Sequence, residues 1–539
     1  MKNIFLFVGL VLSGVCCRNA SERSASQPAN PLSTRDAKVG LSPDVRFGEL
    51  FDSIQLSSTF SDPRGFLDAL PNSTTDSIMA AFKEAKTKPD FSLQDFVNQW
   101  FTLPKPPADA YTSDLLSTPE SHISDLWKVL ARPADTFNLS TLIALPKSYI
   151  LSNGRAKDVH YKEAYFIMLG LQAAGRMDVV ENMVDNFAYL INTEGYVPKG
   201  NRTYYLGRSE PPFFACMVQL LAAEKGETVL TKYLPQLESE YNYWMEGAQK
   251  EAPKDIFTKN HVVQVDRNTL NRYYSKEETP RPEHFKADRD SMRKSTRDEK
   301  ETYRHIRAGS ESGWDFSSRW LDSDKQGDKY KVSNIHAGDI VPIDLNALMY
   351  NLEMTISKAK IVEKKYDEAN EFEKKAAHRR EALMRYCWSE SKGMFFDFDW
   401  QRYRQTEVVS AAMAYPLFFK MVTKREADRV VAAIQQNLVR AGGVVTTTNN
   451  TGQAWDAPNG YAPLQWLTIK GLRNYGHEET ANDIKKRWCD LNIKVFKTTG
   501  KMLEKYNVED LTLESGGGNY PVHDGYGWTN GVLLKLLTE

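Results

Sequence analysis

The sequence predicts an all-α fold, a barrel built from pairs of helices, and two observations lead to this fold class. Stretches with apolar residues at three- and four-residue spacing, and charged residues between them, recur through most of the chain. Strand-like alternation is scarce, and the most β-rich run is the short segment 444–448. The predicted helices are residues 161–174, 177–191, 212–224, 345–363, 366–387, 406–421, 425–439, 464–475 and 478–498.

The N-terminus predicts an export signal. Lys2 is followed by an apolar run over residues 4–12, which is too short to span a bilayer as a helix. Cys16 and Cys17 follow this run, so the leader is either cleaved as a simple signal peptide or acylated as a lipoprotein signal. A buried N-terminal helix is the alternative, but the polar residues after the cysteines give it nothing to pack against. We expect a signal peptide over residues 1–17 and a flexible linker over residues 18–44.

The next segment, residues 45–109, is predicted to be an N-terminal arm rather than a domain. Its apolar residues are mixed with turn residues, and Pro104, Pro106 and Pro107 lie near its end. We expect it to hold too little apolar material for a core of its own. The helical pattern begins near residue 110, so residues 110–539 are expected to form the catalytic domain.

Charge and cysteine content exclude several classes of function. The chain has 69 Lys and Arg against 70 Asp and Glu, with no basic block and no acidic tail, which argues against nucleic acid or an anionic membrane as partner. A small neutral ligand fits this balance better.

Cys216, Cys387 and Cys489 are far apart and odd in number, so they predict no disulfide framework and no zinc site, and we expect them in the core. No metal or organic cofactor is predicted, because His residues are few and no phosphate-binding glycine loop follows a strand.

Three loops combine glycine, aromatic and acidic residues. They cover residues 313–320, 453–463 and 516–531. An isolated Trp-Asp pair beside a glycine is more often a turn packed on a helix end, but three such loops in one chain favour a binding site. Hydrolysis of a glycosidic bond needs one carboxylic acid to protonate the leaving oxygen and a carboxylate to activate water or attack, while aromatic faces hold the sugar ring. The loops supply these groups.

At these residues the chain resembles the trehalases, glycoside hydrolase family 37. Residues 453–463 match a trehalase signature that reads Gln, any residue, Trp-Asp, any residue, Pro, then an aromatic residue before a small residue and Pro. Residues 311–320 and 524–532 also match the family closely. So do Gly200-Asn201-Arg202, Tyr204-Tyr205, Arg208-Ser209 and Pro211-Pro212. The matches keep the family's order and extend from about residue 51 to the C-terminus, so the resemblance covers most of the chain.

The resemblance implies both a fold and a reaction. The fold is an (α/α)6 barrel, a toroid of six helical hairpins, and the reaction is hydrolysis of α,α-trehalose to two glucoses with inversion. The general acid is the Asp of Ser-Gly-Trp-Asp, here Asp315, and the general base is the Glu of Glu-Lys-Tyr, here Glu504. Inversion requires room for a water molecule, so we expect the two carboxyl groups to lie about 6.5–9.5 Å apart.

The resemblance also implies residues that hold the sugar. Four of them match positions where trehalases bind sugar hydroxyls and orient the catalytic groups, and they are Arg155, Arg208, Arg281 and Glu283. Four more substrate-binding candidates lie in or beside the matched motifs, and they are Gly313, Trp455, Asp456 and Asn519. An Arg beside the acid fixes hydroxyl positions and tunes nearby carboxylates. Residues 276–301 are otherwise highly charged and predicted to be a solvated loop or helix face, in which Arg281 and Glu283 alone would form a surface ion pair.

The sequence departs from the family where the sugar is expected to bind. The first trehalase signature reads Pro-Gly-Gly-Arg-Phe, then Glu, Tyr, and Trp-Asp before a Tyr, and it aligns with residues 152–165. The departures replace Phe by Ala156, Trp by Lys162, Asp by Glu163, Asn by Lys199, Gln by Glu210, Trp by Tyr461 and Glu by Asn519. Exchanging a ring-stacking Trp for Lys changes the shape and charge of the pocket by more than one methylene would. We therefore expect altered specificity or weak trehalose activity.

Three functions fit these residues. The first is a working trehalase, and the second is a glycosidase for another α-linked or charged saccharide, with Lys162 and Lys199 as partners for an anionic group. The third is a non-catalytic sugar-binding descendant. We expect a small disaccharide as the partner, no partner protein, and an exported chain that is either periplasmic or anchored to the outer membrane as a lipoprotein.

Overall fold

The structure is a computed structural model of the 539-residue chain. It describes residues 38, 40–57, 64–104, 115–136, 140–153, 157–322, 330–515 and 525–539. The predicted export signal, with Cys16 and Cys17, lies outside the described residues. Among the residues that are described, no helix is both long enough and apolar enough to cross a membrane.

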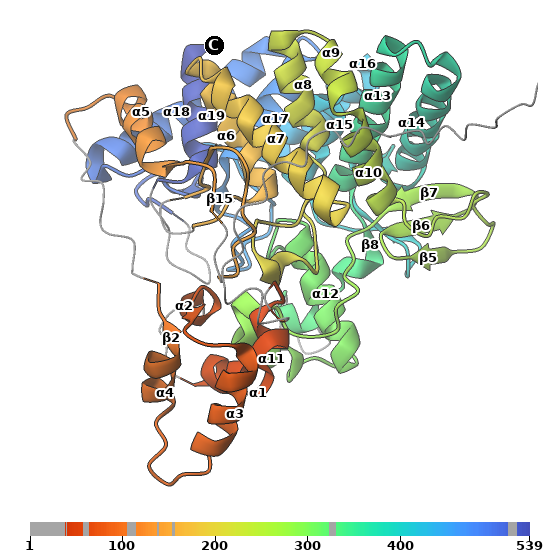
Figure 1. The fold of residues 1–539 in the computed structure, drawn as a ribbon. Coiled ribbons are helices and arrows are strands. Elements are labelled where there is room, and N and C mark those ends of the chain that lie inside the picture. Colours follow the sequence, from red (N-terminus) through yellow and green to blue (C-terminus); the bar gives the residue numbers. More distant parts are fainter. Residues whose placement is uncertain are drawn as a thin grey trace, which may run out of the picture.

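Six helices form a closed ring at the centre of the molecule, in which each helix contacts the next and the last contacts the first. Nearly all side chains of α6, α17 and α19 are buried, which explains why their sequences are apolar on every side. This ring confirms the predicted all-α barrel. Its members are α6 (Tyr161–Ala173), α8 (Phe214–Lys225), α13 (Ile343–Val362), α15 (Tyr415–Phe418), α17 (Ala462–Arg473) and α19 (Gly527–Thr538) (Figure 1).

A second layer of helices covers the ring. Of these outer helices, α7 contacts α6 and α8, α14 packs along α13, and α18 contacts α17 and α19. The buried residues of α14 recur every three or four positions, as expected for a helix with one face on the core. The outer helices are α5 (Pro119–Leu130), α7 (Met177–Glu194), α9 (Thr228–Lys232), α10 (Leu234–Trp244), α14 (Tyr366–Tyr386), α16 (Lys424–Asn437) and α18 (Glu478–Thr499).

The N-terminal elements lie together on one side of the barrel, beside α11 (Phe285–Met292) and α12 (Glu299–Glu311) (Figure 1). They are α1 (Pro43–Leu56), α2 (Arg64–Leu67), α3 (Thr75–Ala85) and α4 (Leu93–Trp100). Their buried side chains, many of them Phe, form a separate cluster that extends to Tyr204, Tyr205 and Phe285 of the barrel part. The predicted division into an arm over residues 45–109 and a catalytic domain over residues 110–539 stays a prediction.

The strands are short, and in the described residues they form five two-stranded and two three-stranded antiparallel sheets. The pairs are β1 (Leu70–Pro71) with β2 (Phe101–Thr102), β3 (Ala131–Arg132) with β4 (Tyr149–Ile150), β9 (Trp388–Ser389) with β10 (Met394–Phe395), β13 (Val439–Arg440) with β14 (Gly443–Val444), and β15 (Asn459–Gly460) with β16 (Tyr506–Asn507). The triples are β5 (Phe257–Lys259), β6 (Val262–Val265) and β7 (Asn268–Asn271), and β8 (Ile340–Val341), β11 (Phe398–Asp399) and β12 (Arg404–Gln405). Short 3-10 helices complete the fold: η1 (Thr203–Tyr205), η2 (Pro282–His284), η3 (Val332–Asn334), η4 (Ala337–Asp339) and η5 (Ala411–Ala414).

Two sequence predictions of secondary structure were wrong. Among the described residues the longest strands are β6 and β7, whereas only Val444 of residues 444–448 belongs to a strand. The predicted helix over residues 406–421 is instead an extended segment followed by η5 and the four-residue α15. Pro416 has no N–H group and so cannot lie inside a long helix, and Ser410 pairs with Thr447 across an isolated bridge.

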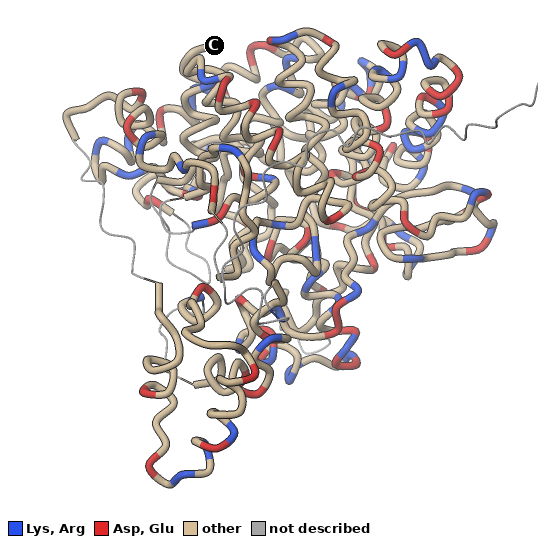
Figure 2. Tube along the Cα trace, in the orientation of Figure 1, with Lys and Arg blue, Asp and Glu red and all other residues tan. Residues whose placement is uncertain are grey.

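Charged residues of both signs are interspersed along the chain (Figure 2). The charged segment 276–301 is largely helical, since it contains η2, α11 and the start of α12.

The predicted core position of Cys216, Cys387 and Cys489 is confirmed, because all three are free and buried.

Candidate active site

The loops that lead into the inner helices carry the predicted catalytic and substrate-binding groups. Asp315 lies between α12 and α13, Arg208 precedes α8, Trp455 precedes α17, and Glu504 lies between α18 and α19. Side-chain contacts join these loops although they are far apart in the sequence. For example, the indole N–H of Trp528 in α19 donates to the backbone oxygen of Glu504 at 2.9 Å, and the Trp528 ring packs edge-on against Trp455.

The Asp315 carboxyl lies among cations. Its Oδ2 atom is 3.7 Å from Nζ of Lys199, 3.6 Å from Nη1 of Arg281 and 3.4 Å from the Ser310 hydroxyl. The side chain is 24% exposed, so the carboxyl is not sealed in the core. Burial alone would raise the pKa of Asp315, but Lys199 and Arg281 outweigh it and hold the pKa below its usual value. The acid candidate is therefore biased toward its ionised form.

Arg281 and Glu283 are buried rather than on the surface, and they do not pair with each other. Arg281 makes a two-point ion pair with Asp288 of α11, at 2.9 Å from Nε and 2.7 Å from Nη2. Glu283 accepts a hydrogen bond from Arg208, which is fully buried. Burial would raise the pKa of Glu283, but Arg208 and other nearby cations hold it well below its usual value. Arg281 therefore lies beside Asp315, whereas Arg208 is paired with Glu283.

Asp456 fastens the segment that follows Asp315. Its carboxylate accepts hydrogen bonds from the backbone N–H of Ser318 at 2.8 Å and from the hydroxyls of Ser317 and Thr447, each at 2.9 Å. It is fully buried, and burial raises its pKa. These contacts position the acid-bearing loop, and the predicted role of Asp456 in binding sugar stays a prediction.

Trp455 has both ring faces occupied. Tyr461 stacks parallel to it with ring centroids 3.8 Å apart. The ammonium group of Lys162 lies 4.4 Å from the centroid of the Trp455 ring. Because Tyr461 covers one face, the ammonium takes the other, as in a cation–π contact. The same ammonium lies 5.7 Å from the centroid of the Trp528 ring.

Glu504 is buried on a segment that is tied to the Trp455 loop. In the short β15–β16 ladder, Asn459 pairs with Asn507 and Gly460 pairs with Tyr506. The Thr529 hydroxyl of α19 donates to the backbone oxygen of Leu503 at 2.7 Å. The segment around the base candidate is therefore held from two sides, by the Trp455 loop and by an inner helix.

Three of the residues that depart from the trehalase pattern, Lys162, Lys199 and Glu210, lie near the Asp315 loop. Lys162 donates from Nζ to the Gly313 backbone oxygen at 2.6 Å, and Gly313 has a φ of +66°. Lys199 donates to the Ser310 backbone oxygen at 3.0 Å and lies 3.5 Å from Glu210. The Glu210 carboxylate also accepts the backbone N–H of Lys162 in the first turn of α6, a favourable place for an anion.

The remaining site residues named from the sequence are Glu163, Arg155, Ala156 and Asn519. Glu163 accepts a hydrogen bond from the Tyr526 hydroxyl at 3.0 Å, and burial raises its pKa. Arg155, Ala156 and Asn519 lie outside the described residues. The described ranges contain no group of three or more His, Cys, Asp or Glu side chains that could hold a metal ion.

Sequence reasoning missed residues that orient the site through other residues. Glu311, in the matched motif before Asp315, is fully buried and accepts hydrogen bonds from the backbone N–H groups of Ser209 and Tyr274, at 3.1 and 3.0 Å. Arg319, in the same motif, makes ion pairs with Asp344 and Asp397. Both charges lie inside a mostly apolar core, and a charged residue within a matched motif was the signal that could have identified them.

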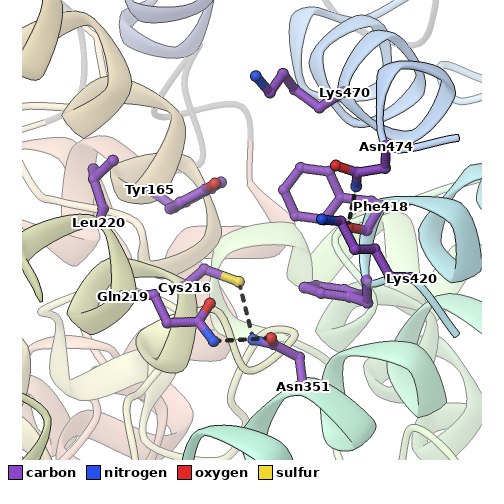
Figure 3. A pocket seen from close by; sticks show the side chains of 10 residues that line it. Tyr165, Cys216, Gln219, Leu220, Asn351, Phe418, Lys420, Lys470 and Asn474 are labelled. Atoms are coloured by element: carbon purple, nitrogen blue, oxygen red, sulfur yellow. Dashed lines mark hydrogen bonds between the residues drawn. The ribbon is translucent and has the colours of Figure 1, made fainter. Parts of the chain in front are cut away.

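A separate cavity of about 340 Å³ lies between the inner helices and contains none of the predicted site residues. Gln219 of α8 and Asn351 of α13 face each other in it, and the Gln219 amide donates to Asn351 at 3.1 Å (Figure 3). The Asn351 amide also approaches the Cys216 sulfur at 3.5 Å. The candidate active site, in contrast, lies where the inner helices begin.

Comparisons with known proteins identify the family. The family model described as Trehalase matches residues 58–539. The periplasmic trehalase of Pseudomonas aeruginosa is 41% identical over 543 residues, which cover 98% of this chain and 95% of that protein. The periplasmic trehalase of Salmonella schwarzengrund is 39% identical over 533 residues, which cover 98% of this chain and 91% of that protein.

Solved structures share the fold. The neutral trehalase of Saccharomyces cerevisiae has a TM-score of 0.59 at 20% identity, with 95% of this chain and 94% of that chain covered. A mannosylglycerate hydrolase of glycoside hydrolase family 63 from Thermus thermophilus has a TM-score of 0.54 at 13% identity, with 77% of this chain and 99% of that chain covered. Taken with the matched loops and their geometry, these findings lead to one conclusion: the chain belongs to the trehalase family of glycoside hydrolases.

Proposed function

We propose that the protein hydrolyses α,α-trehalose to two glucoses with inversion, with Asp315 as general acid and Glu504 as general base. The observation that carries this proposal is the position of Asp315, a partly exposed carboxyl held by Arg281 and Lys199 in a loop fastened by Asp456. Membership of the trehalase family and the names of the relatives support the substrate.

The reaction follows from the two carboxyl groups. Asp315 gives its proton to the glycosidic oxygen as the bond from that oxygen to the anomeric carbon breaks. Glu504 takes a proton from a water molecule whose oxygen bonds to the same carbon from the opposite side. The products are two glucose molecules, one of them inverted at the attacked carbon. Asp315 ends ionised and Glu504 ends protonated, and proton exchange with solvent restores both groups.

Arginines and aromatic residues are proposed to hold the sugar. Arg208 is fully buried, and its Nε and Nη1 atoms have no hydrogen-bond partner among the described residues, so we expect them to donate to sugar hydroxyls that enter beside them. Arg281 places one more donor beside Asp315. Trp455 and Gly313 shape the wall that carries Lys162. Arg155 and Asn519 remain candidates from the sequence alone.

Glucose release from trehalose by the purified chain tests the proposal. Asp315→Asn and Glu504→Gln are each expected to lower kcat by about 10²–10⁴-fold, the usual contribution of a general acid or base. Asp428→Asn is the matched control, because Asp428 is an exposed carboxyl that pairs with Lys424 on the surface. A wild-type chain that releases no glucose, or an Asp315→Asn chain at wild-type rate, would overturn the assignment.

We further infer export to the periplasm, which the periplasmic relatives support. The predicted leader is either acylated on Cys16 or Cys17 as a lipoprotein signal or cleaved as a simple signal peptide. Mass spectrometry of the mature N-terminus from a Gram-negative host distinguishes them, because acylation adds fatty-acid mass to a terminal cysteine.

A further inference from the structure

The N-terminal elements α1–α4 contact the barrel part through charged side chains as well as through their buried Phe cluster. Arg64 of α2 lies 3.6 Å from an Asp158 oxygen and donates a hydrogen bond to the Tyr205 hydroxyl. Asp68, which follows α2, lies 3.1 Å from Nη1 of Arg202. Two ion pairs therefore cross from the N-terminal elements to the barrel part.

The Asp158 carboxyl is buried just before the inner helix α6. Its side chain is 2% exposed, and its Oδ2 atom lies 3.6 Å from Nη2 of Arg64, 3.6 Å from Nε2 of His160 and 3.9 Å from Nε of Arg202. Burial would raise the pKa of Asp158, but His160 and Arg64 outweigh it and hold the pKa well below its usual value. A buried carboxylate depends on the cations around it, so the loss of one cation disturbs the contacts that remain.

His160 connects Asp158 to Glu163. His160 directly precedes α6, and its two ring nitrogens face two carboxylates: Nε2 faces Asp158, while Nδ1 lies 3.9 Å from a Glu163 oxygen. Burial would lower the pKa of His160, but Asp158 and Glu163 outweigh it and raise the pKa above its usual value. A charged imidazolium attracts both carboxylates, so a change at Asp158 reaches Glu163 through the ring.

Glu163 belongs to the candidate active site. It lies in the first turn of α6, next to Lys162, and accepts a hydrogen bond from the Tyr526 hydroxyl at 3.0 Å. The Tyr526 ring lies beside Trp528, with ring centroids 4.8 Å apart, and the Trp528 N–H donates to the Glu504 backbone oxygen. A path of charged side chains thus leads from the N-terminal elements to the side of the site that carries the base candidate.

We propose that Arg64 is a positioning residue for the active site. It holds Asp158, and His160 transmits the position of that carboxylate to Glu163. The inference rests on the proposed hydrolysis and adds the N-terminal elements to the parts of the chain on which sugar binding depends. Because Arg64 acts through other residues, its removal should weaken sugar binding although it takes no group away from the site.

A purely structural ion pair is the alternative, and it predicts a different result. In that case the loss of Arg64 would lower the free energy of unfolding and would have the same effect on sugar binding in any version of the site. If Arg64 acts through Glu163, its effect depends on the Glu163 carboxylate. A double-mutant cycle distinguishes the two, because residues that share one network show an interaction energy.

Glucose binding by isothermal titration calorimetry is the direct test, because it needs no turnover. Arg64→Met is expected to weaken glucose binding by about threefold to thirtyfold, the usual range for a residue coupled to a site through a network. In the Glu163→Gln background the same substitution should change the affinity by less than about twofold. An unchanged affinity in the first case, or an equal loss in both backgrounds, overturns the proposal.

His160→Gln provides a second background for the cycle, because it interrupts the path and leaves Glu163 in place. Arg64→Met should change the affinity of this variant by less than about twofold, and a loss as large as in the wild type overturns the proposal. Arg64→Lys keeps the charge and should retain an affinity within about threefold of the wild type.

Lys86→Met is the matched control, because Lys86 pairs with Glu49 on the exposed surface of the same N-terminal elements. It should leave glucose binding unchanged. Urea unfolding of each variant shows whether a loss of affinity comes from unfolded protein. Glucose release from trehalose is measured with the same preparations. Absence of hydrolysis together with coupled effects on glucose binding would reject the proposed function and leave this inference standing.

Discussion

The ammonium group of Lys162 lies on the face of Trp455 that Tyr461 leaves uncovered, 4.4 Å from the ring centroid. A sugar ring stacks on the open face of an aromatic side chain, so a cation in this place competes with a neutral sugar for the same surface. This single contact connects the departure in the first signature to the loop of the second. It also makes the effect of restoring the family residue predictable.

Lys162→Trp is expected to raise kcat/KM for trehalose by about tenfold or more, because it removes a buried charge and returns a stacking ring to the pocket. Lys162→Met is the control, since it removes the charge without adding a ring. Steady-state glucose release measures both. A tryptophan variant that is no faster than wild type would show that Lys162 does not limit trehalose turnover.

Lys199→Asn is expected to move the alkaline limb of kcat/KM for trehalose to higher pH. Asp315 must be protonated to act, and Lys199, Arg281 and other nearby cations hold its pKa below its usual value. Activity is therefore lost as pH rises through that lowered pKa, and removing Lys199 raises the pKa. Lys199→Arg keeps the charge and should leave the limb where it is. The groups near Asp315 that remain in the variant are Lys162, Arg281, His284 and Ser310.

Gly313→Ala should reduce both stability and activity. At φ +66° an added methyl strains the backbone, and its Cβ would lie 2.3 Å from Nζ of Lys162. We expect a loss of about 1–2 kcal/mol in the free energy of unfolding. Gly476→Ala is the matched control, because Gly476 has a φ of +80° with no atom within 4 Å of the added Cβ. Urea unfolding and kcat compared between the two variants isolate the contact with Lys162, and an equal loss of activity in both would contradict it.

Asp288→Asn should destabilise the protein by about 3 kcal/mol, because it leaves the buried Arg281 guanidinium without a compensating charge. Asp290→Asn, two residues later in the same helix, breaks only exposed pairs with Lys286 and Arg293 and should leave stability unchanged. Urea denaturation monitored by circular dichroism measures both. Similar curves for the two variants would mean that the Arg281–Asp288 pair is not needed for the fold.

The stereochemistry of the products tests the two-carboxylate mechanism. Inversion at the attacked carbon of α,α-trehalose releases one β-glucose, while the leaving ring retains its α configuration. Proton NMR in the first minutes of reaction should therefore show both anomers in equal amounts, before mutarotation mixes them. Release of α-glucose alone would indicate a retaining mechanism and carboxyl groups only about 5 Å apart.

Most helices of the barrel could be predicted because apolar residues recur at helical spacing within each segment. The predicted helix over residues 177–191 corresponds to α7, and that over residues 478–498 corresponds to α18 within a few residues. The two wrong predictions of secondary structure concern residues 406–421 and the β6–β7 hairpin. Pro416 and the bridge from Ser410 to Thr447 interrupt an otherwise helical pattern. The β6–β7 hairpin turns at Asp266 and Arg267, both with positive φ, where sequence signals usually show Asn or Gly.

Which side chains contact each other in the site was less predictable than which residues belong to it. The adjacency of Arg281 and Glu283 suggested a pair, but the two side chains point to different partners, Asp288 and Arg208. Asp456 was identified by its signature, whereas its contact with Ser318 spans 138 residues of sequence. Long-range pairings of this kind depend on how the helices pack, which residue spacing alone does not encode.

The loop between Trp455 and Gly460 is tied to the segments that carry both proposed catalytic carboxyl groups. Asp456 fixes the residues that follow the acid, and Asn459 and Gly460 pair with the strand that follows the base. Lys162 and Lys199 lie on neither of these connections. Mutation of the two lysines can therefore change which sugar is accepted without breaking the contacts that hold the segments of the proposed acid and base. In evolutionary terms, this geometry separates the part of the enzyme that can diversify from the part that must be kept.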